Sequence, residues 1–334
     1  MSNLKEVEQS AYQIIANLNE LKQEIKKVIV GQEEIIDQLL ITFLAGGHAL
    51  LEGVPGLAKT LMIRSLSEAI DLRFRRIQFT PDLMPSDIIG TEILEEDHTT
   101  GKRIFKFNKG PLFANIILAD EINRTSPKTQ SALLEAMQEF AVTYAGTTYP
   151  LERPFFILAT QNPIEQSGTF PLPEAQLDRF LLYIKVDYPT LEEERSILEN
   201  TTGKKSEPIK NVIAGNKILE AQKLVREVHI NSELIDWVSR IVRATRPGQK
   251  ENNYVDEWVR WGAGPRAGQA MILTAKARAL LHGNFSVTQD DIRHVAYPVL
   301  RHRILMNFKA EAERVYPDDV TKHLLQTIAM SKSL

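Results

Sequence analysis

The sequence contains no cysteine among its 334 residues. This absence excludes disulfide bridges, thiolate zinc sites, iron–sulfur clusters and cysteine nucleophiles together. Any catalytic or metal site in the chain must therefore be built without thiolates. A chain of this length can still bury a large hydrophobic core without covalent cross-links.

Long hydrophobic runs are also lacking. The longest nearly apolar stretch, residues 39–51, has about 13 residues and contains Gly46, Gly47 and His48, whereas about 20 apolar residues are needed to cross a bilayer. The N-terminus has no basic start followed by an apolar run, so it does not resemble a secretory signal. We therefore expect a soluble, cytoplasmic protein without a membrane segment.

Neither sign of charge is in excess. Forty lysine and arginine residues stand against 43 aspartate and glutamate residues, which gives a net charge of −3. A protein that coats nucleic acid by neutralising phosphates is usually more basic. A local basic groove is compatible with balanced totals, so the charge argues only weakly against a nucleic-acid partner.

The spacing of apolar residues predicts an α/β fold of about two domains. Short apolar runs that are typical of buried parallel strands occur at residues 48–53, 74–79, 115–120, 154–160 and 180–186. Helical patterns separate most of these runs, as in a sheet with right-handed crossovers. From residue 191 onward the pattern is almost entirely helical. We place the domain boundary near Tyr188–Pro189, between an α/β domain (1–188) and a helical domain (189–334).

Two stretches interrupt the alternation of strands and helices in the first domain. Residues 80–114 are rich in proline and glycine and contain short β-like pieces such as RIFKF. Residues 141–152 predict a hairpin around Ala145–Gly146. Both stretches read as insertions into the α/β pattern.

A phosphate-binding loop follows the first predicted strand. The segment GVPGLAKT, residues 53–60, has the spacing G-x-x-x-x-G-K-[ST] except that alanine occupies position 58, and a helical pattern follows it. Glycines let backbone N–H groups surround a phosphate, and the helix N-terminus adds partial positive charge. In this chemistry Lys59 reaches the β- and γ-phosphates of a nucleotide, and Thr60 ligates Mg²⁺. The alternative is a glycine-rich loop with an incidental lysine.

Two carboxylates end the third predicted strand. Asp120 and Glu121 follow the run IILA, at the strand end where open α/β sheets bind ligands. Asp120 is a candidate for holding Mg²⁺, and Glu121 is a candidate general base that polarises the attacking water. The alternative is that both residues merely cap the next helix.

Three further polar residues stand at informative positions. Asn162 follows the fourth predicted strand, where an amide can hold the attacking water or contact the γ-phosphate, although Asn-Pro also marks ordinary turns. Arg179 precedes the last strand, and a surface salt bridge with Asp178 or Glu174 would also explain it. Arg266 lies where Pro265 opens a helix and could be a simple exposed charge. A neighbouring subunit's arginine can stabilise phosphoryl transfer.

Taken together, these segments resemble the AAA+ ATPases and most closely the MoxR family. The resemblance runs from about residue 30 to at least residue 303, and GVPGLAKT with its alanine is a form common in MoxR proteins. It rests on the segments GVPGLAKT, LADEINRTSPKTQSALLEAMQE, ATQNPIEQSGTFPLPEAQLDRF, GPRA and LRHRI. It implies a core five-stranded parallel sheet with a helical lid, and a ring of subunits, usually six, with nucleotide between them.

The resemblance also assigns roles to individual residues. It makes Glu121 and Asp120 the Walker B pair, Asn162 sensor 1, Arg179 the arginine finger that acts in trans, and Arg266 sensor 2. Arg124 becomes a further candidate at the subunit interface. It implies an insert in helix 2 at about 80–114 and a hairpin before sensor 1 at about 141–152. The residues that it implies for nucleotide binding are Val30, Gly31, Gln32, Gly53, Val54, Pro55, Gly56, Leu57, Ala58, Lys59, Thr60 and Leu61.

Three functions are compatible with these observations. The first is a Mg²⁺-dependent ATP motor that remodels or activates protein partners, which in the MoxR family often carry a von Willebrand A domain. The second is a scaffold whose assembly is set by bound ATP, although such a scaffold would not need Glu121 or Arg179. The third is a DNA-acting motor, which the net charge and the lack of a nucleic-acid module disfavour.

Overall fold

The computed structural model describes residues 2–29, 31–53, 59–96, 103–162, 168–201, 208–248 and 253–330. Its α-helices are α1 (Ser2–Lys26), α2 (Glu33–Leu44), α3 (Lys59–Ile70), α4 (Pro85–Ile89), α5 (Pro127–Glu139), α6 (Glu174–Leu177), α7 (Leu191–Thr201), α8 (Gly215–Glu227), α9 (Ser232–Ala244), α10 (Asn253–Trp258), α11 (Pro265–Leu281), α12 (Gln289–Leu300), α13 (Phe308–Glu313) and α14 (Pro317–Thr327). Its strands are β1 (Ala49–Gly53), β2 (Phe74–Gln78), β3 (Gly90–Glu96), β4 (Arg103–Lys109), β5 (Ile116–Asp120), β6 (Ala141–Tyr144), β7 (Thr147–Pro150), β8 (Phe156–Gln161), β9 (Leu182–Val186), β10 (Val259–Trp261) and β11 (Leu305–Met306). A short 3₁₀ helix spans Ile122–Arg124.

The predicted five-stranded parallel sheet is confirmed. Its strand order is β2-β5-β8-β1-β9, and every neighbouring pair is parallel. The β5 residues Ile116 to Ala119 are fully buried, because this strand is covered on both faces. Strand β2 lies at the sheet edge, which explains why its sequence FRRIQ alone carries several polar residues. Parallel strands end at one common edge, so the ends of β1, β5 and β8 face the same side.

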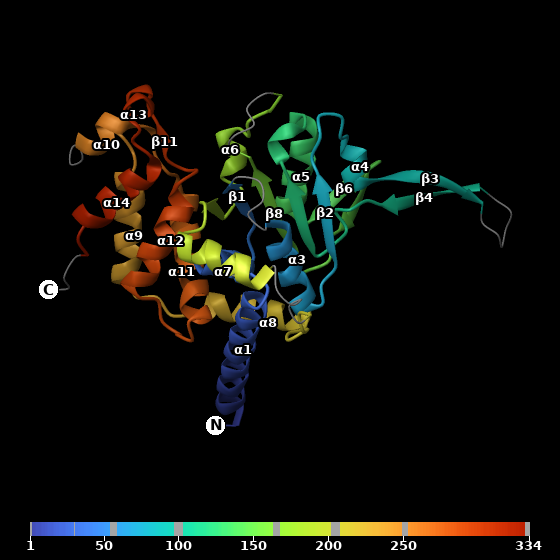
Figure 1. The fold of residues 1–334 in the computed structure, drawn as a ribbon, viewed down its shortest axis with the longest axis horizontal. Helices are drawn as coiled ribbons and strands as arrows, with labels where there is room; N and C mark the ends of the chain where they lie inside the picture. Colours follow the sequence, from blue (N-terminus) through green and yellow to red (C-terminus); the bar gives the residue numbers. More distant parts are fainter. Residues whose placement is uncertain are drawn as a thin grey trace.

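The C-terminal helices α8 to α14 form a second group beside the sheet (Figure 1). The segment Thr288–Asp291 begins α12 with a capping box, in which the Thr288 hydroxyl accepts a hydrogen bond from Asp291 N at 3.2 Å. This region also contains one short antiparallel pair, β10 with β11, which the helical pattern did not predict. Valine and tryptophan in β10 favour extended backbone. In the described part of the chain, no helix has the length and apolarity needed to span a bilayer.

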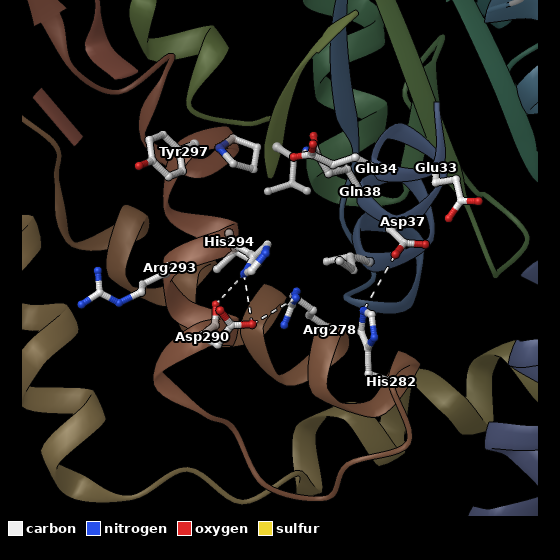
Figure 2. A pocket seen from close by; sticks show the side chains of 14 residues that line it. Glu33, Glu34, Asp37, Gln38, Arg278, His282, Asp290, Arg293, His294 and Tyr297 are labelled. Carbon is white, nitrogen blue, oxygen red and sulfur yellow. Dashed lines mark hydrogen bonds and ion pairs between the residues drawn. The ribbon is translucent and has the colours of Figure 1, made fainter. Parts of the chain in front are cut away.

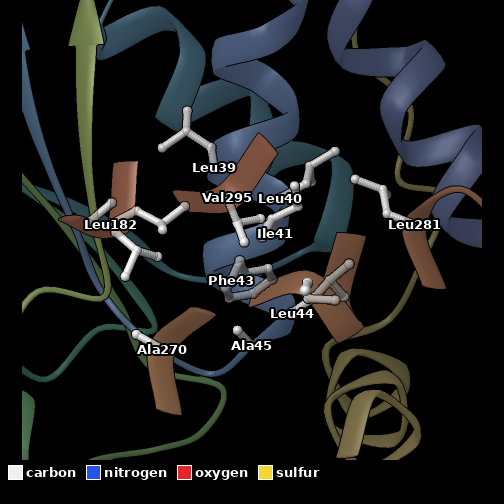
Figure 3. Close-up of a cluster of buried hydrophobic side chains, with 14 of the residues drawn as sticks. Leu39, Leu40, Ile41, Phe43, Leu44, Ala45, Leu182, Ala270, Leu281 and Val295 are labelled. Carbon is white, nitrogen blue, oxygen red and sulfur yellow. The ribbon is translucent and has the colours of Figure 1, made fainter. Parts of the chain in front are cut away.

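Hydrophobic burial joins the two groups of elements. One cluster of buried side chains extends from α1 and α2 through one face of the sheet to the C-terminal helices; Phe43, Leu44 and Leu182 lie within it beside Ala270 (Figure 3). Trp237, from α9, is fully buried in the same cluster. Side chains on the other sheet face form a second cluster with α5. The helical group is therefore packed against the sheet by a shared core, and the domain boundary near residue 188 stays a prediction.

The insert after β2 contains α4 and the long hairpin β3–β4, which projects away from the sheet (Figure 1). The hairpin β6–β7 lies where Ala145–Gly146 predicts a turn, and both turn residues have positive φ, 48° and 81°. An aromatic group joins the two hairpins: the ring of Phe107 on β4 stacks on Tyr149 of β7, with centroids 4.4 Å apart. The two insertions are thus in contact with each other.

Candidate functional site

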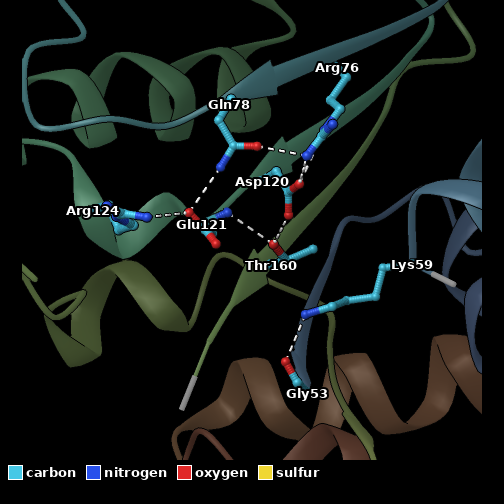
Figure 4. Close-up of polar contacts among 8 residues, drawn as sticks. All are labelled: Gly53, Lys59, Arg76, Gln78, Asp120, Glu121, Arg124 and Thr160. Atoms are coloured by element: carbon cyan, nitrogen blue, oxygen red, sulfur yellow. Dashed lines mark hydrogen bonds and ion pairs between the residues drawn. The ribbon is translucent and has the colours of Figure 1, made fainter. Parts of the chain in front are cut away.

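The sheet order gathers the predicted phosphate-loop and acidic residues at one edge. Lys59 begins α3, which follows β1, and Asp120 ends β5. Between these two strands lies β8, and Asn162 follows its last residue. Figure 4 shows Lys59 facing the side of the sheet on which Asp120, Glu121 and Thr160 lie. Residues distant in the sequence therefore meet where open parallel sheets bind ligands.

Lys59 carries the positive charge on the phosphate-loop side of this edge. Its ammonium donates a hydrogen bond to the carbonyl oxygen of Gly53 at 2.7 Å. Partial burial lowers the pKa of Lys59, while the charges of Asp120 and Glu121 oppose this effect. Thr60 is half-buried, and the side chain of Leu61 is exposed. The predicted contacts from Val54 to Ala58 lie outside the described residues, as does Val30.

Asp120 is held by a hydroxyl on one oxygen and by a guanidinium on the other. The buried Thr160 hydroxyl donates to Asp120 Oδ1 at 2.6 Å. Arg76 of the edge strand β2 donates to Asp120 Oδ2 through Nε at 3.1 Å and through Nη2 at 2.6 Å. The carboxylate is therefore fixed in direction and already paired with a cation.

Glu121 has an unusual backbone for a residue with a side chain. Its φ of 58° and ψ of 50° lie in the left-handed region, which costs a non-glycine residue about 1–2 kcal/mol. Its backbone N–H donates to the Thr160 hydroxyl at 2.9 Å, and its carboxylate accepts from Gln78 at 2.9 Å and from Arg124 at 3.0 Å. Such strain is typical of functional sites, where surrounding contacts hold a residue in place.

Gln78 links the two acidic residues. Its amide oxygen accepts a hydrogen bond from Arg76 Nη2 at 2.7 Å, while its amide nitrogen donates to Glu121. Arg76 and Gln78 are two apart on β2, so their side chains point to the same face. Arg124, which the resemblance places at the subunit interface, pairs here with Glu121 of its own chain. Gln78 therefore connects Arg76, the charge partner of Asp120, with Glu121.

The remaining predicted residues at this edge lie as follows. Asn162 is buried, with 6% of its surface exposed. Gly31 and Gln32 both have positive φ and precede α2. The backbone N–H of Gln32 donates to Glu193 of α7 at 3.3 Å, and its amide oxygen is buried without a hydrogen-bond partner among the described residues. A buried acceptor of this kind is suited to a donor from a bound ligand.

The structure brings Arg179 and Arg266 together, and Lys59 is not among the residues around them. Both line a cavity of about 240 Å³ with Met137, Gln138 and Asp178. The Arg266 guanidinium lies 3.5 Å from Asp178, whereas Asp178 forms its shorter ion pair, at 2.7 Å, with Arg303. Among the described residues, Asp178 therefore forms its ion pairs with Arg266 and Arg303 and not with Arg179. Arg179 is exposed.

Sequence reasoning missed several residues of these two clusters. Arg76 and Gln78 give a usable signal, because polar residues stand out in a strand of a sheet that is otherwise apolar. Thr160 gives none, since a threonine is common in any strand. The segment LRHRI resembles a family signature, but its sequence alone assigns no role to Arg303 or to its partner Asp178.

A second, larger cavity lies beside the start of α2, whose first residue follows Gln32 in the sequence. It has a volume of about 640 Å³ and is lined by side chains of α2, α11 and α12 (Figure 2). Some of its ionisable side chains lie close to one another: His294 lies 3.3 Å from Asp290, and His282 lies 3.8 Å from Asp37. None of the predicted site residues lines this cavity.

Comparison with protein families gives two matches along the chain. Residues 48–182 match the family described as "ATPase family associated with various cellular activities (AAA)". Residues 252–324 match the family described as "AAA lid domain". The first match contains Lys59, Asp120, Glu121, Asn162 and Arg179, and the second contains Arg266.

Several proteins are similar to the chain over most of its length. Chaperone MoxR1 of Mycobacterium tuberculosis is 44% identical over 92% of this chain and 80% of its own length. YeaC, an uncharacterized protein of Bacillus subtilis, is 41% identical over 93% of this chain and 94% of its own. Protein MoxR of Paracoccus denitrificans is 29% identical over 90% and 91%. A solved structure from Cytophaga hutchinsonii, named as an ATPase, has a TM-score of 0.92 and 42% identity, and the match covers 99% of this chain and all of that one.

Proposed function

Because the chain belongs to the MoxR family of AAA+ ATPases, we propose that the edge formed by β1, β8 and β5 is its site of ATP hydrolysis. The observation that carries this proposal is the meeting of three groups at one edge. These are the ammonium of Lys59, the acidic pair Asp120–Glu121, and the buried Asn162 between them. An ATPase needs all three kinds of group to hold phosphates and activate water.

In this proposal, the phosphates and the adenine of the nucleotide bind to different residues. Lys59 and the N-terminus of α3 bind the phosphates, because the ammonium and the helix dipole both favour negative charge. Gly31 and Gln32 bind the adenine. The buried, unpartnered amide oxygen of Gln32 supports this role, since the amino group of adenine can donate to it.

Asp120 and Thr60 suit a magnesium ion, which prefers carboxylate and hydroxyl oxygens over nitrogen or sulfur. The pairing of Asp120 with the Arg76 guanidinium supports this assignment, because the carboxylate already accepts a cation at this position. When bound, Mg²⁺ supplies positive charge to the phosphate oxygens. Thr160 keeps the Asp120 carboxylate turned toward the site by donating to its other oxygen.

Glu121 is the proposed general base, and Asn162 helps to position the attacking water. In the structure the Glu121 carboxylate accepts the hydrogen bonds from Gln78 and Arg124 through the same oxygen, Oε2. In this proposal the other oxygen, Oε1, takes the proton from water, while the two partners on Oε2 and the strained backbone hold the carboxylate in place.

Arg179 and Arg266 are proposed to serve the nucleotide of a neighbouring subunit. Their shared cavity supports this, because two guanidinium groups held together and exposed match the charge of a triphosphate. A site completed by a neighbour requires a head-to-tail interface, which closes into a ring. We propose a hexameric ring.

The ring's output is proposed to be the chaperone-like remodelling of partner proteins in the cytoplasm. The name of the relative Chaperone MoxR1 supports a chaperone role. The long hairpin β3–β4, with the exposed side chains of Leu94 and Phe105, offers apolar contact to a protein client. Clients that carry a von Willebrand A domain are the proposed partners.

Two substitutions test the hydrolytic site. Glu121→Gln should lower kcat at least about 100-fold while ATP binding stays within a few-fold of the wild type, because only the proton acceptor is lost. Lys59→Ala should instead weaken ATP binding itself. Fluorescent-nucleotide binding and steady-state phosphate release would be measured on both proteins. Wild-type turnover in Glu121→Gln would remove Glu121 from the role of base.

A further inference from the structure

The short turn formed by residues 178–181, between α6 and β9, carries Arg179. We call it the arginine turn. Two residues of the segment LRHRI form hydrogen bonds with its carbonyl oxygens. Arg303 donates to the oxygens of Phe180 at 2.8 Å and Leu181 at 3.2 Å, and a ring nitrogen of His302 lies 3.0 Å from the oxygen of Phe180. The backbone on the C-terminal side of Arg179 is thus fixed by the helical group.

The side chain of Asp178 lies between Arg303 and the exposed guanidinium of Arg266. Arg303 Nε donates to Asp178 Oδ1 at 2.7 Å, and Arg266 lies 3.5 Å from Oδ2. The Arg303 side chain is 4% exposed, whereas that of Arg266 is 62% exposed. One carboxylate therefore lies between a buried, fixed guanidinium and an exposed, adjustable one.

The Arg303 guanidinium is anchored on every side. It donates a further hydrogen bond to the carbonyl oxygen of Val299, in the last turn of the preceding helix α12, at 2.6 Å. Burial lowers the pKa of Arg303, and Asp178 opposes this by stabilising the charged form. Removing Asp178 would leave the buried charge of Arg303 uncompensated, so the contact between the two resists displacement.

We propose that Arg303, acting through Asp178, is a positioning residue that presents Arg179 and Arg266 together to the nucleotide of a neighbouring subunit. This inference rests on the proposed trans role of Arg179. An arginine on an exposed turn reaches a phosphate reproducibly only when its backbone is fixed, and a misplacement of about 1 Å costs about 100-fold in rate. Arg303, which belongs to the helical group, fixes the backbone of the arginine turn. This role explains why a charged side chain is buried there.

The test compares variants of the positioning pair with a matched control. Asp178→Asn and Arg303→Lys should each lower kcat about 10- to 100-fold with KM for ATP within twofold, since the variant's own phosphate site is intact. Arg301→Lys is the control. Arg301 bonds Asp318 and the carbonyl oxygen of Tyr183, so it also joins the helical group to β9 but does not touch the arginine turn. It should keep wild-type kcat.

Mixed rings separate positioning from general damage. Each variant is mixed in equal amounts with Glu121→Gln, whose subunits have no general base but present intact arginines. A head-to-tail interface then makes about a quarter of the junctions competent, so activity should recover to about a quarter of the wild type. An Arg179→Ala mixture, measured in parallel, should recover equally. Circular dichroism and nucleotide binding verify that each variant is folded.

The outcomes are distinct. The inference is supported if ATPase activity recovers in the mixtures of Glu121→Gln with Asp178→Asn, with Arg303→Lys and with Arg179→Ala. If the Arg179→Ala mixture recovers but the Asp178→Asn and Arg303→Lys mixtures do not, the pair has no positioning role, and the trans role of Arg179 stands. Wild-type kcat in both pair variants overturns the inference as well. If the Arg179→Ala mixture itself fails to recover, the trans role falls, and the inference falls with it.

Discussion

Asp120 accepts hydrogen bonds from a threonine and from an arginine, and these two partners have different consequences. Thr160 is buried and orients the carboxylate without competing for its charge. Arg76 is about half exposed and neutralises the same carboxylate. Because Mg²⁺ in the proposed site would need that negative charge, Arg76 and the ion would compete for Asp120.

The substitution Arg76→Gln should therefore lower the Mg²⁺ concentration needed for half-maximal ATPase activity. An exposed ion pair is worth about 1 kcal/mol at most, so the expected shift is up to about fivefold. Titration of Mn²⁺ by electron paramagnetic resonance measures the same affinity without turnover. Arg75→Gln is the control, because Arg75 points to the opposite face of β2. An unchanged or higher metal requirement in Arg76→Gln would contradict competition.

His48 gives a prediction about stability and pH. Its Nδ1 accepts from the backbone N–H of Ile157 at 3.0 Å, and its Nε2 lies 3.1 Å from the carbonyl oxygen of Met137, so the buried ring is neutral. Burial lowers the pKa of His48 from its ordinary 6.5 to about 4. The unfolded chain therefore binds a proton that the folded chain refuses, and the free energy of unfolding falls as the pH drops from 6.5 toward 4.

Comparison with His48→Gln isolates this effect from the other titrating groups. Between pH 7 and pH 4 the wild type should lose about 3 kcal/mol more of its free energy of unfolding than the variant loses. Urea unfolding at a series of pH values measures both proteins. Parallel pH profiles of the two would show that His48 does not titrate differently in the folded state.

At the scale of elements, the hairpins β3–β4 and β6–β7 are joined through aromatic rings. Phe107 stacks on Tyr149 with an interplanar angle of 19°, and its ring centroid is 5.2 Å from that of Tyr144. Aromatic pairs contribute about 0.5–1.5 kcal/mol each beyond the area they bury. The β3–β4 hairpin is therefore tied at its base to the hairpin that precedes β8 and Asn162.

Phe107→Ala should loosen the base of the β3–β4 hairpin. Loss of its three aromatic pairs, with Phe113, Tyr144 and Tyr149, should raise amide hydrogen exchange in β4 at least about tenfold, because the free energy of local opening falls. Phe105→Ala is the matched control: Phe105 is two residues away on the same face, but its side chain is 74% exposed. Equal exchange in the two variants would show that the aromatic group does not hold the hairpin.

The elements of the sheet could be predicted from the sequence, whereas the contacts between distant elements could not. Strands β5 and β9 lie within the predicted apolar runs at residues 115–120 and 180–186. Apolar periodicity records local burial, which is why these elements are visible. The pairs Arg76–Asp120 and Arg303–Asp178 span 44 and 125 positions. No local pattern encodes such partners, because they depend on strand order and on how the helical group packs.

At the scale of the whole molecule, the charged groups that we propose for phosphoryl transfer lie in two places. Lys59 and the acidic pair lie at the sheet edge, while Arg179 and Arg266 share a cavity with Asp178. A single chain therefore presents the proposed ATP site at one place and a pair of arginines at another. In the proposed head-to-tail ring, repetition of the chain would bring the two together at every interface.

The central claim, that hydrolysis needs the arginines of a neighbour, is tested most directly by the ATPase activity per subunit as a function of protein concentration. Particle size would be measured by light scattering on the same samples. Activity per subunit should be low for monomers, rise as rings form and then reach a plateau, while Arg179→Ala should assemble without the rise. If the wild-type activity per subunit were the same for monomers and rings, hydrolysis would not need the arginines of a neighbour.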